Sequence, residues 1–301
     1  MIRISTQTLF ETGAARIGEV QAGLAKTQQQ ISTGRRMVSP SDDPVAAARV
    51  LEVSQTQSLN TQFGVNRMHA NYALTASEGT LAGVTALIQD VKDTIISAGN
   101  PSIGDSERGF MATDLRARLD ALMGLANTRD AAGDYIFAGF RTDAPAFSKD
   151  PLTNAVTYNG DAGQKLMQVD ATRQMAVNHS GSSVFQGGGQ DLFQTLNDLI
   201  TLFETPGAPS AAVLGTHNAN IDLALDNVLT VRAALGSRLQ EIDALNNVGE
   251  DRGLQYSQIL SELQDLDYTQ ALTQLSQQQF VLEAAHRSFV STSALSLFKF
   301  M

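Results

Sequence analysis

Apolar residues recur every seven positions at both ends of the chain. Near the N-terminus the series is Phe10, Ile17, Leu24 and Ile31, with Val20 on the intervening turn. Toward the C-terminus two series follow one another: Leu235, Ile242, Gly249, Tyr256 and Leu263, then Tyr268, Leu275, Leu282 and Phe289. A strict period of seven places a narrow apolar stripe along a helix and is typical of coiled coils. Both ends are therefore predicted to be helices that pack along a partner helix.

The positions beside these stripes are neutral. Glutamines at 28–30 and 277–279 stand where pairs of Glu and Lys flank an ordinary coiled coil. A polar face exposed to water explains this most simply. A face packed against several neighbours explains it as well, because a buried amide can find hydrogen bonds where a buried unpaired charge would be costly.

Further helices are predicted between the ends. Leu74, Leu81, Ile88 and Ile95 again step by seven. Asp43 is expected to cap the helix that starts at Pro44, because a carboxylate accepts hydrogen bonds from the free amides of a first turn and proline suits the first helical position.

Start and stop signals bound the remaining helices. A helix over 107–130 is expected to be capped by Asp105 or Ser106, and another is expected to be capped by Asp191. From 211 the chain reads as helix almost to its end, with a joint around 246–253.

The pattern changes after Tyr135, where short β-like runs replace the helical period. These runs lie at 156–158, 166–169 and 174–177, and Asn159-Gly160 between two of them is typical of a hairpin turn. We interpret this stretch as a small inserted β-rich domain, which the glycines at 187–189 join to the next helix as a hinge.

These patterns together predict a mainly α protein with an inserted β-rich domain. The expected shape is an elongated rod, since a helix of about 50 residues spans roughly 75 Å. We expect terminal coiled-coil segments over 1–43 and 268–301, a helical rod domain over 44–140 and 187–267, and the β domain over 141–186.

Composition and charge exclude several functions. The 301 residues include no cysteine, which removes disulfides, thiol nucleophiles and cysteine-ligated metals, and the 4 histidines are too far apart to form a local ligand pair. A net charge of −10 argues against nucleic-acid binding. The longest weakly polar run, 288–298, is about half the ~20 residues of a spanning helix, so no membrane insertion is expected. Residues 1–10 do not read as a signal peptide, so we expect a cytoplasmic protein or one exported without a cleaved leader.

Catalytic chemistry is not indicated. The glycine triplet lacks the Lys-Ser/Thr of a phosphate loop. Asp42 and Asp43 suit a helix cap better than a pair of acid and base, and Arg35-Arg36 suits a solvated turn or a contact with a neighbouring subunit. We therefore expect no enzyme, no catalytic, cofactor-binding or metal-binding residues, and no cofactor.

Several segments resemble one family. Residues 31–48, ISTGRRMVSPSDDPVAAA, resemble the N-terminal signature of bacterial flagellins and hook-associated proteins. Residues 135–145, YIFAGFRTDAP, resemble a segment typical of the hook-associated protein 3 branch, which joins hook and filament. The segments at 265–268, 277–279 and 295–298 are similar to the terminal helix of that branch. The set spans both ends and the middle of the chain.

The resemblance implies a flagellin-like, non-catalytic axial protein of the bacterial flagellum. In this family the terminal helices pair as a coiled coil lining the inner tube, are disordered in the monomer and fold on assembly. The implied role is a self-associating junction ring between hook-associated protein 1 and the flagellin filament. The implied route is the type III export apparatus, with a cytoplasmic chaperone at the C-terminal helix. The protein would thus be transiently cytoplasmic and finally extracellular, in the flagellum.

The stripes at the two ends supply candidate interface residues. We predict that the assembly interface consists of Phe10, Ile17, Leu24, Ile31, Leu275, Leu282, Phe289, Leu295 and Leu297. An exposed C-terminal stripe would aggregate, so the chaperone is expected to cover it as an amphipathic helix in a groove. For that contact we predict Leu275, Leu282 and Phe289.

Two alternatives stay open. One is a short flagellin that builds the filament itself, although flagellins usually end in Leu-Leu-Arg and this chain ends in LFKFM. The other is a type III translocator, which shares heptads but should carry a hydrophobic hairpin of spanning length.

Overall fold

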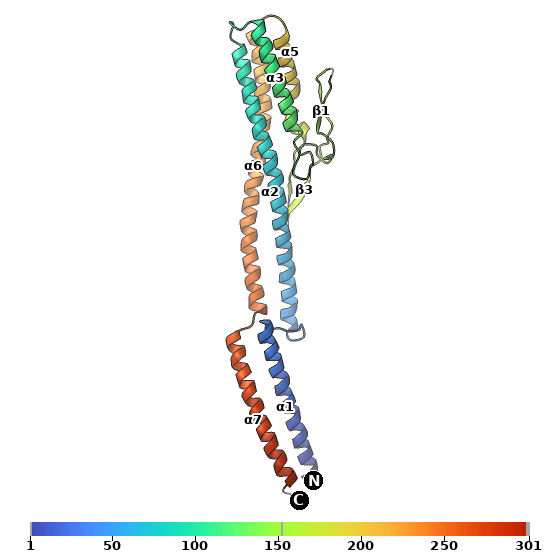
Figure 1. The fold of residues 1–301 in the computed structure, drawn as a ribbon, viewed down its shortest axis with the longest axis vertical. Helices are drawn as coiled ribbons and strands as arrows, with labels where there is room; N and C mark the ends of the chain where they lie inside the picture. The colour runs from blue at the N-terminus through green and yellow to red at the C-terminus, as the bar shows by residue number, and fades with distance from the viewer. Residues whose placement is uncertain (1, 152, 299–301) are drawn as a thin grey trace. The chain divides into compact units, whose positions relative to one another are not determined.

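The chain folds mainly into long helices with a small strand-containing region, which confirms the predicted fold class (Figure 1). The computed structural model describes residues 2–151 and 153–298, and side chains at 8, 10–151 and 153–291. Its elements are α1 (Ile2–Thr33), α2 (Pro44–Ala98), α3 (Asp105–Ala126), β1 (Phe147–Lys149), β2 (Val156–Tyr158), β3 (Leu166–Asp170), β4 (Arg173–Ala176), α4 (Gly181–Phe185), α5 (Leu192–Glu204), α6 (Ala211–Gln264) and α7 (Tyr268–Phe298).

Contacts divide the chain into two compact units. Unit 1 comprises Met1–Leu59 and Asp251–Met301, and unit 2 comprises Asn60–Glu250. Unit 1 therefore contains α1 and α7 with the beginning of α2 and the end of α6. Unit 2 contains everything between, including all four strands.

Unit 2 has a continuous apolar core. Helices α3 and α5 pack against each other and present leucines spaced by three and four residues, as one face of a helix requires. Their side chains are at most 2% exposed: Leu115, Leu119, Leu122, Leu196, Leu199 and Phe203. The predicted cap of α5 is confirmed, because Asp191 Oδ1 accepts the amides of Phe193 at 2.9 Å and Gln194 at 3.1 Å.

The strands form two separate antiparallel pairs, β1 with β2 and β3 with β4. Phe147 of β1 meets Phe185 of α4 edge-on and Phe193 of α5 at a tilt, at centroid distances of 5.5 and 4.8 Å. All three rings are at most 1% exposed and belong to the same buried cluster as α3. The strands thus share the core of unit 2 with its helices.

The predicted hairpin at Asn159-Gly160 is wrong. The strand that precedes it, β2, pairs with β1, a strand of three residues that is too short to show alternation. The residue with positive φ in this connection is Asn154, at 56°. The second hairpin, β3–β4, turns between Asp170 and Arg173.

Three helix boundaries also differ from the prediction. The expected joint at 246–253 is absent, because α6 runs unbroken through it. Helix α3 ends at Ala126, short of 130, and its N-cap is Gly104, which has no side chain to bond the first turn. Asp43, in contrast, caps α2 as predicted, since its Oδ1 accepts the Ala46 amide at 2.9 Å.

A buried arginine accounts for a glycine within α6. Arg67 of α2 is 4% exposed and donates to Asn246 Oδ1 of α6 at 2.7 Å and to the Val169 carbonyl of β3 at 3.0 Å. Its guanidinium lies against Gly249, where an added Cβ would overlap it. Asn60 of α2 also donates to the Gly249 carbonyl, at 2.8 Å. Glycine is kept in this helix because the arginine occupies the space of a side chain.

We expect Gly249→Ala to destabilise unit 2 by about 1–3 kcal/mol, because the methyl group displaces a buried charged donor from its partners. The matched control is Gly236→Ala in the same helix, where an added Cβ meets nothing within 4 Å. That change should stabilise by up to about 1 kcal/mol through helix propensity. Urea unfolding of both variants measures the difference, and equal stabilisation by both would contradict the proposed packing.

Candidate assembly surface

Helices α1 and α7 pack along each other within unit 1 (Figure 1). The positions that face the partner helix alternate spacings of three and four, as the a and d positions of a coiled coil do. We call these residues the terminal seam: Phe10, Gly13, Ile17, Val20, Leu24, Thr27 and Ile31 on α1, and Ala271, Leu275, Gln278, Leu282, Ala285 and Phe289 on α7.

Small residues bring the two helices close at several levels of the terminal seam. A Cβ added to Gly13 would lie 3.2 Å from the ring of Phe289, and that ring stacks on Phe10 at a centroid distance of 4.8 Å. Thr27 is only 2% exposed, and its hydroxyl donates to the Gly23 carbonyl at 3.1 Å. The buried hydroxyl is thereby satisfied within its own helix.

The structure brings seven of the nine predicted interface residues together on this seam. Six of them are half-buried: Ile17, Leu24, Ile31, Leu275, Leu282 and Phe289. Phe10 is 52% exposed. The side chains of Leu295 and Leu297 lie outside the described residues. The role of the set in assembly stays a prediction.

Sequence reasoning missed the positions between the sevens. Ala271 is 4% exposed and Thr27 is 2% exposed, so they are the most deeply covered residues of the terminal seam. Each lies three or four residues from a predicted member, and this alternating spacing was the available signal. Small and polar side chains do not register as an apolar stripe, which is why the pattern passed over them.

Pairing leaves much apolar surface uncovered. Most seam residues are only half-buried, and α7 carries further exposed apolar side chains on its other positions. Their exposed fractions are 52% for Leu272, 73% for Phe280, 42% for Val281 and 65% for Val290. Apolar surface of α7 is therefore open to solvent beyond the terminal seam.

The α1–α2 and α6–α7 connections are joined by backbone hydrogen bonds. Arg36 N donates to the Gln264 carbonyl at 2.7 Å, and Leu266 N donates to the Gly34 carbonyl at 3.0 Å. Gly34 adopts a φ of +69°, and an added Cβ there would meet the Tyr268 hydroxyl at 2.9 Å. Both helix breaks therefore form one small antiparallel ladder.

Asp42 organises the loop beside this ladder. Its carboxylate accepts hydrogen bonds from Lys26 Nζ at 2.7 Å and from the amides of Val38 and Ser39 at 3.0 and 3.1 Å. The Lys26 bond, followed by those two amides, lowers the pKa of Asp42 from 3.8 to about 2. All of its described bonds serve to fix the loop.

An apolar groove of about 570 Å³ lies between this loop and the start of α2. Its lining includes Met37, Val38, Pro40, Pro44 and Leu51, and Leu51 is 70% exposed. Its polar lining residues are Arg35, Ser39, Ser54 and Gln264, and the other lining residues are apolar. A mostly apolar groove of this kind suits contact with another protein.

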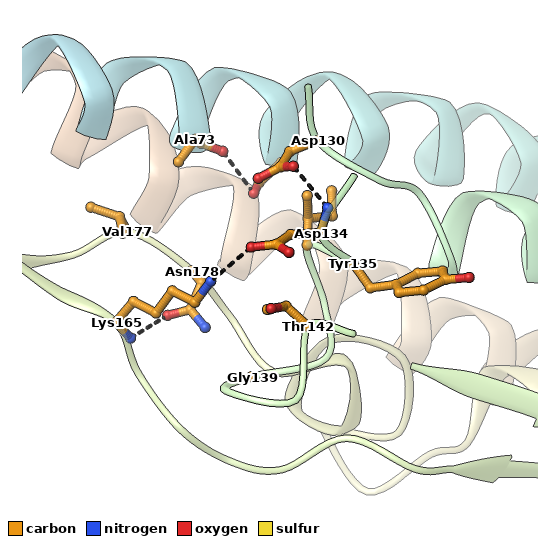
Figure 2. A pocket seen from close by; sticks show the side chains of 11 residues that line it. Ala73, Asp130, Asp134, Tyr135, Gly139, Thr142, Lys165, Val177 and Asn178 are labelled. Atoms are coloured by element: carbon orange, nitrogen blue, oxygen red, sulfur yellow. Dashed lines mark hydrogen bonds and ion pairs between the residues drawn. The ribbon is translucent and has the colours of Figure 1, made fainter. Parts of the chain in front are cut away.

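A second cavity, in unit 2, is shown in Figure 2 and has a volume of about 60 Å³. Lys165 Nζ lies 3.8 Å from Asp134 Oδ2, and Asp130 Oδ1 accepts the amides of Ala132 and Asp134. Ligand pockets usually measure about 300–1,000 Å³, so this one is too small for a substrate. The Asp130 carboxylate is occupied by amides of its own loop, and the Asp134 carboxylate is occupied by Lys165.

The described part of the chain contains no group of three or more His, Asp or Glu side chains arranged to hold a metal ion. None of its helices combines the length and the apolar character needed to cross a bilayer.

Known proteins resemble this chain over its full length. Residues 4–142 match the family model described as the bacterial flagellin N-terminal helical region. The chain is 36% identical to flagellar hook-associated protein 3 of Escherichia coli (strain K12) and to that of Salmonella typhimurium, with 99% of each sequence covered. It is also similar to the solved flagellar junction protein FlgL of Legionella pneumophila, with a TM-score of 0.61 and 21% identity over 73% of this chain and 100% of that one. That structural similarity bears on the fold alone.

The loop clamp gives a pH-dependent prediction. Because the pKa of Asp42 is lower in the folded chain, the clamp stabilises the loop above about pH 4 and loses this contribution as the pH falls toward 2. A carboxyl NMR titration of Asp42 in assembled chains, where residues 1–43 are expected to be folded, should show a midpoint near 2, and Lys26→Gln should raise it toward 3.8. Lys149→Gln, which removes a lysine bonded to Asp120, is the control and should leave it unchanged. A midpoint near 3.8 in the unaltered, assembled protein would refute the clamp.

Proposed function

This chain belongs to the flagellar hook-associated protein 3 family, and we propose that it is a non-catalytic structural component of the junction between hook and filament. The observation that carries the proposal is the incomplete burial of the terminal seam. Two paired helices with exposed Leu272, Phe280 and Val290 present an apolar surface that needs further helices to cover it.

The physical logic of assembly follows from this shortage of burial. Ordering a residue costs about 1–2 kcal/mol in backbone entropy, and a half-buried seam recovers little of it. Segments 1–43 and 268–301 are therefore disordered in the free monomer and fold when neighbouring copies cover their outer faces. Assembly buries the apolar surface of the terminal helices that a single chain leaves exposed.

The other parts of the chain follow the family arrangement. In the proposed junction the paired terminal helices line the inner tube, residues 44–140 and 187–267 form the surrounding rod, and residues 141–186 lie at larger radius. Copies of the chain associate in a ring, with hook-associated protein 1 on one side and flagellin on the other.

Export explains why the terminal segments should stay unfolded beforehand. We propose that the chain passes through the type III export apparatus from the cytoplasm to the growing flagellum. A cytoplasmic chaperone would bind the α7 stripe at Leu275, Leu282 and Phe289 and prevent its aggregation. The same apolar atoms serve the chaperone first and the terminal seam later, so the two contacts exclude each other.

Leu282→Asp should abolish attachment of filaments, because a charge on the terminal seam prevents α1 and α7 from pairing. Ser276→Asp is the matched control, since Ser276 is an exposed residue of α7 that belongs neither to the terminal seam nor to the exposed apolar side chains, and its filaments should stay attached. Circular dichroism should show that unit 2 stays folded in both variants, and electron microscopy counts attached filaments. Motile cells with attached filaments in the Leu282→Asp strain would overturn the proposal.

Limited proteolysis of the purified monomer tests the folding step separately. We expect rapid loss of residues within 1–43 and 268–301 and persistence of a resistant middle fragment, identified by mass spectrometry. The same protease applied to assembled flagella should leave the ends intact. Equal protection of the ends in the monomer would mean that the helix pair is stable before assembly.

A further inference from the structure

The motif Phe137-Ala-Gly-Phe140 places its two aromatic rings in opposite environments. Phe137 is 0% exposed and meets Phe185 edge-on at a centroid distance of 5.3 Å. Phe140 is 62% exposed, although it lies three residues further along. The first ring serves the core of unit 2, and the second has no comparable structural use.

The loop that carries Phe140 is fixed in place. Asp161 Oδ1 accepts the amides of Phe140 at 2.9 Å and Gly163 at 2.7 Å, and Asp161 N donates to the Ala138 carbonyl at 3.2 Å. Gly139 has a φ of +73°, which suits glycine. The two amides, Phe140 first, lower the pKa of Asp161, so the carboxylate stays charged and the loop stays held.

One face of the Phe140 ring is covered within the chain. A Cβ at Gly163 would overlap that ring, so the ring rests on bare backbone. Its other face is left to the solvent. A rigid aromatic side chain that loses little entropy on binding is typical of the anchors of protein interfaces. Arg141 follows it and is also exposed, with its guanidinium donating to the Asn159 carbonyl at 3.3 Å.

A groove elsewhere on unit 2 has complementary properties. It measures about 470 Å³, lies between α2 and α3, and is lined by Asp90, Asp93, Thr94, Ser97, Phe110, Met111, Asp114 and Arg118. Phe110 is 72% exposed. The groove therefore combines apolar surface with three carboxylates and one guanidinium.

The negative charge of this groove is only partly balanced. Arg118 pairs with Asp90 at 2.7 Å and with Asp114 at 2.6 Å. Asp93 is exposed and has no ion-pair partner among the described residues. An arginine next to an aromatic ring on another molecule could pair with the Asp93 carboxylate and also contact the face of the Phe110 ring.

We propose that Phe140 and Arg141 of one copy of this chain dock into the Asp93–Phe110 groove of a second copy. Both halves of the contact lie on unit 2, and an exposed aromatic-arginine pair meets an aromatic-acidic groove. Because the two patches differ, the contact is heterologous, and such contacts continue around a ring or a helix. This inference rests on the proposed function for the presence of neighbouring copies, and it names the surfaces by which they touch.

The absence of cysteine allows a direct test in assembled flagella. Arg141→Cys and Asp93→Cys chains are coexpressed, each with its own epitope tag, and treated with a bismaleimide of short reach. We expect dimers that carry both tags, and no dimers from either variant alone. The doubly substituted chain should give a ladder beyond the dimer. Dimers from Arg141→Cys alone, or no product in flagella with attached filaments, would overturn the contact.

Charge reversal provides a second measurement that does not depend on cross-linking. Asp93→Arg should reduce attached filaments, and adding Arg141→Asp in the same chain should restore them. Phe140→Ala should weaken the contact about thirtyfold, which is the scale of an interface anchor. Tyr72→Ala is the control and should leave the contact unchanged, because Tyr72 is a similarly exposed aromatic residue of α2, at 66%. Failure of the double substitution to rescue would count against the pairing.

The two proposals fail in different ways. Loss of the cross-link with filaments still attached removes the contact and leaves the junction function standing. If cells that lack this chain still attach filaments, the junction function itself is refuted.

Discussion

Two helices packed along one seam can cover only one side of each other. The α1–α7 pair shows this limit, because Phe10 is 52% exposed and Phe280 is 73% exposed, while Thr27 and Ala271 are the deeply buried residues of the terminal seam. Unit 2 has no such shortage, since its leucines and phenylalanines close around α3 and α5. The two units therefore differ in how completely each buries its own apolar side chains.

The spacing of apolar residues predicted the long helices, because the same spacing repeats many times along each of them. The heptads at both ends identified the stripe now seen on the terminal seam, and Asp43 and Asp191 located two helix starts through simple capping chemistry. The signal failed where a residue serves a distant partner. The joint expected around 246–253 is absent, and Gly249 in this range leaves room for Arg67, which lies far away in sequence and cannot be read from local spacing.

Short elements were equally hard to predict. Strand β1 has three residues, too few to alternate, and its pairing with β2 depends on the aromatic cluster around Phe147. The acidic groove on unit 2 had no sequence signature, because Asp93 and Phe110 come together only when α2 and α3 pack. Features formed by one segment could be predicted from the sequence. Features formed by two segments, such as this groove, depend on how the segments pack and could not.

The ladder between the two connections links the beginning of the chain to its end. The Arg36 side chain bonds to the Leu263 carbonyl across a separation of 227 residues, and Arg36 N bonds to Gln264 beside it. Contacts so distant form late, because nearly the whole chain must be present before they close. A truncated molecule that stops before α7 leaves α1 without the helix that it packs against. The terminal seam therefore requires the last helix of the chain as well as the first.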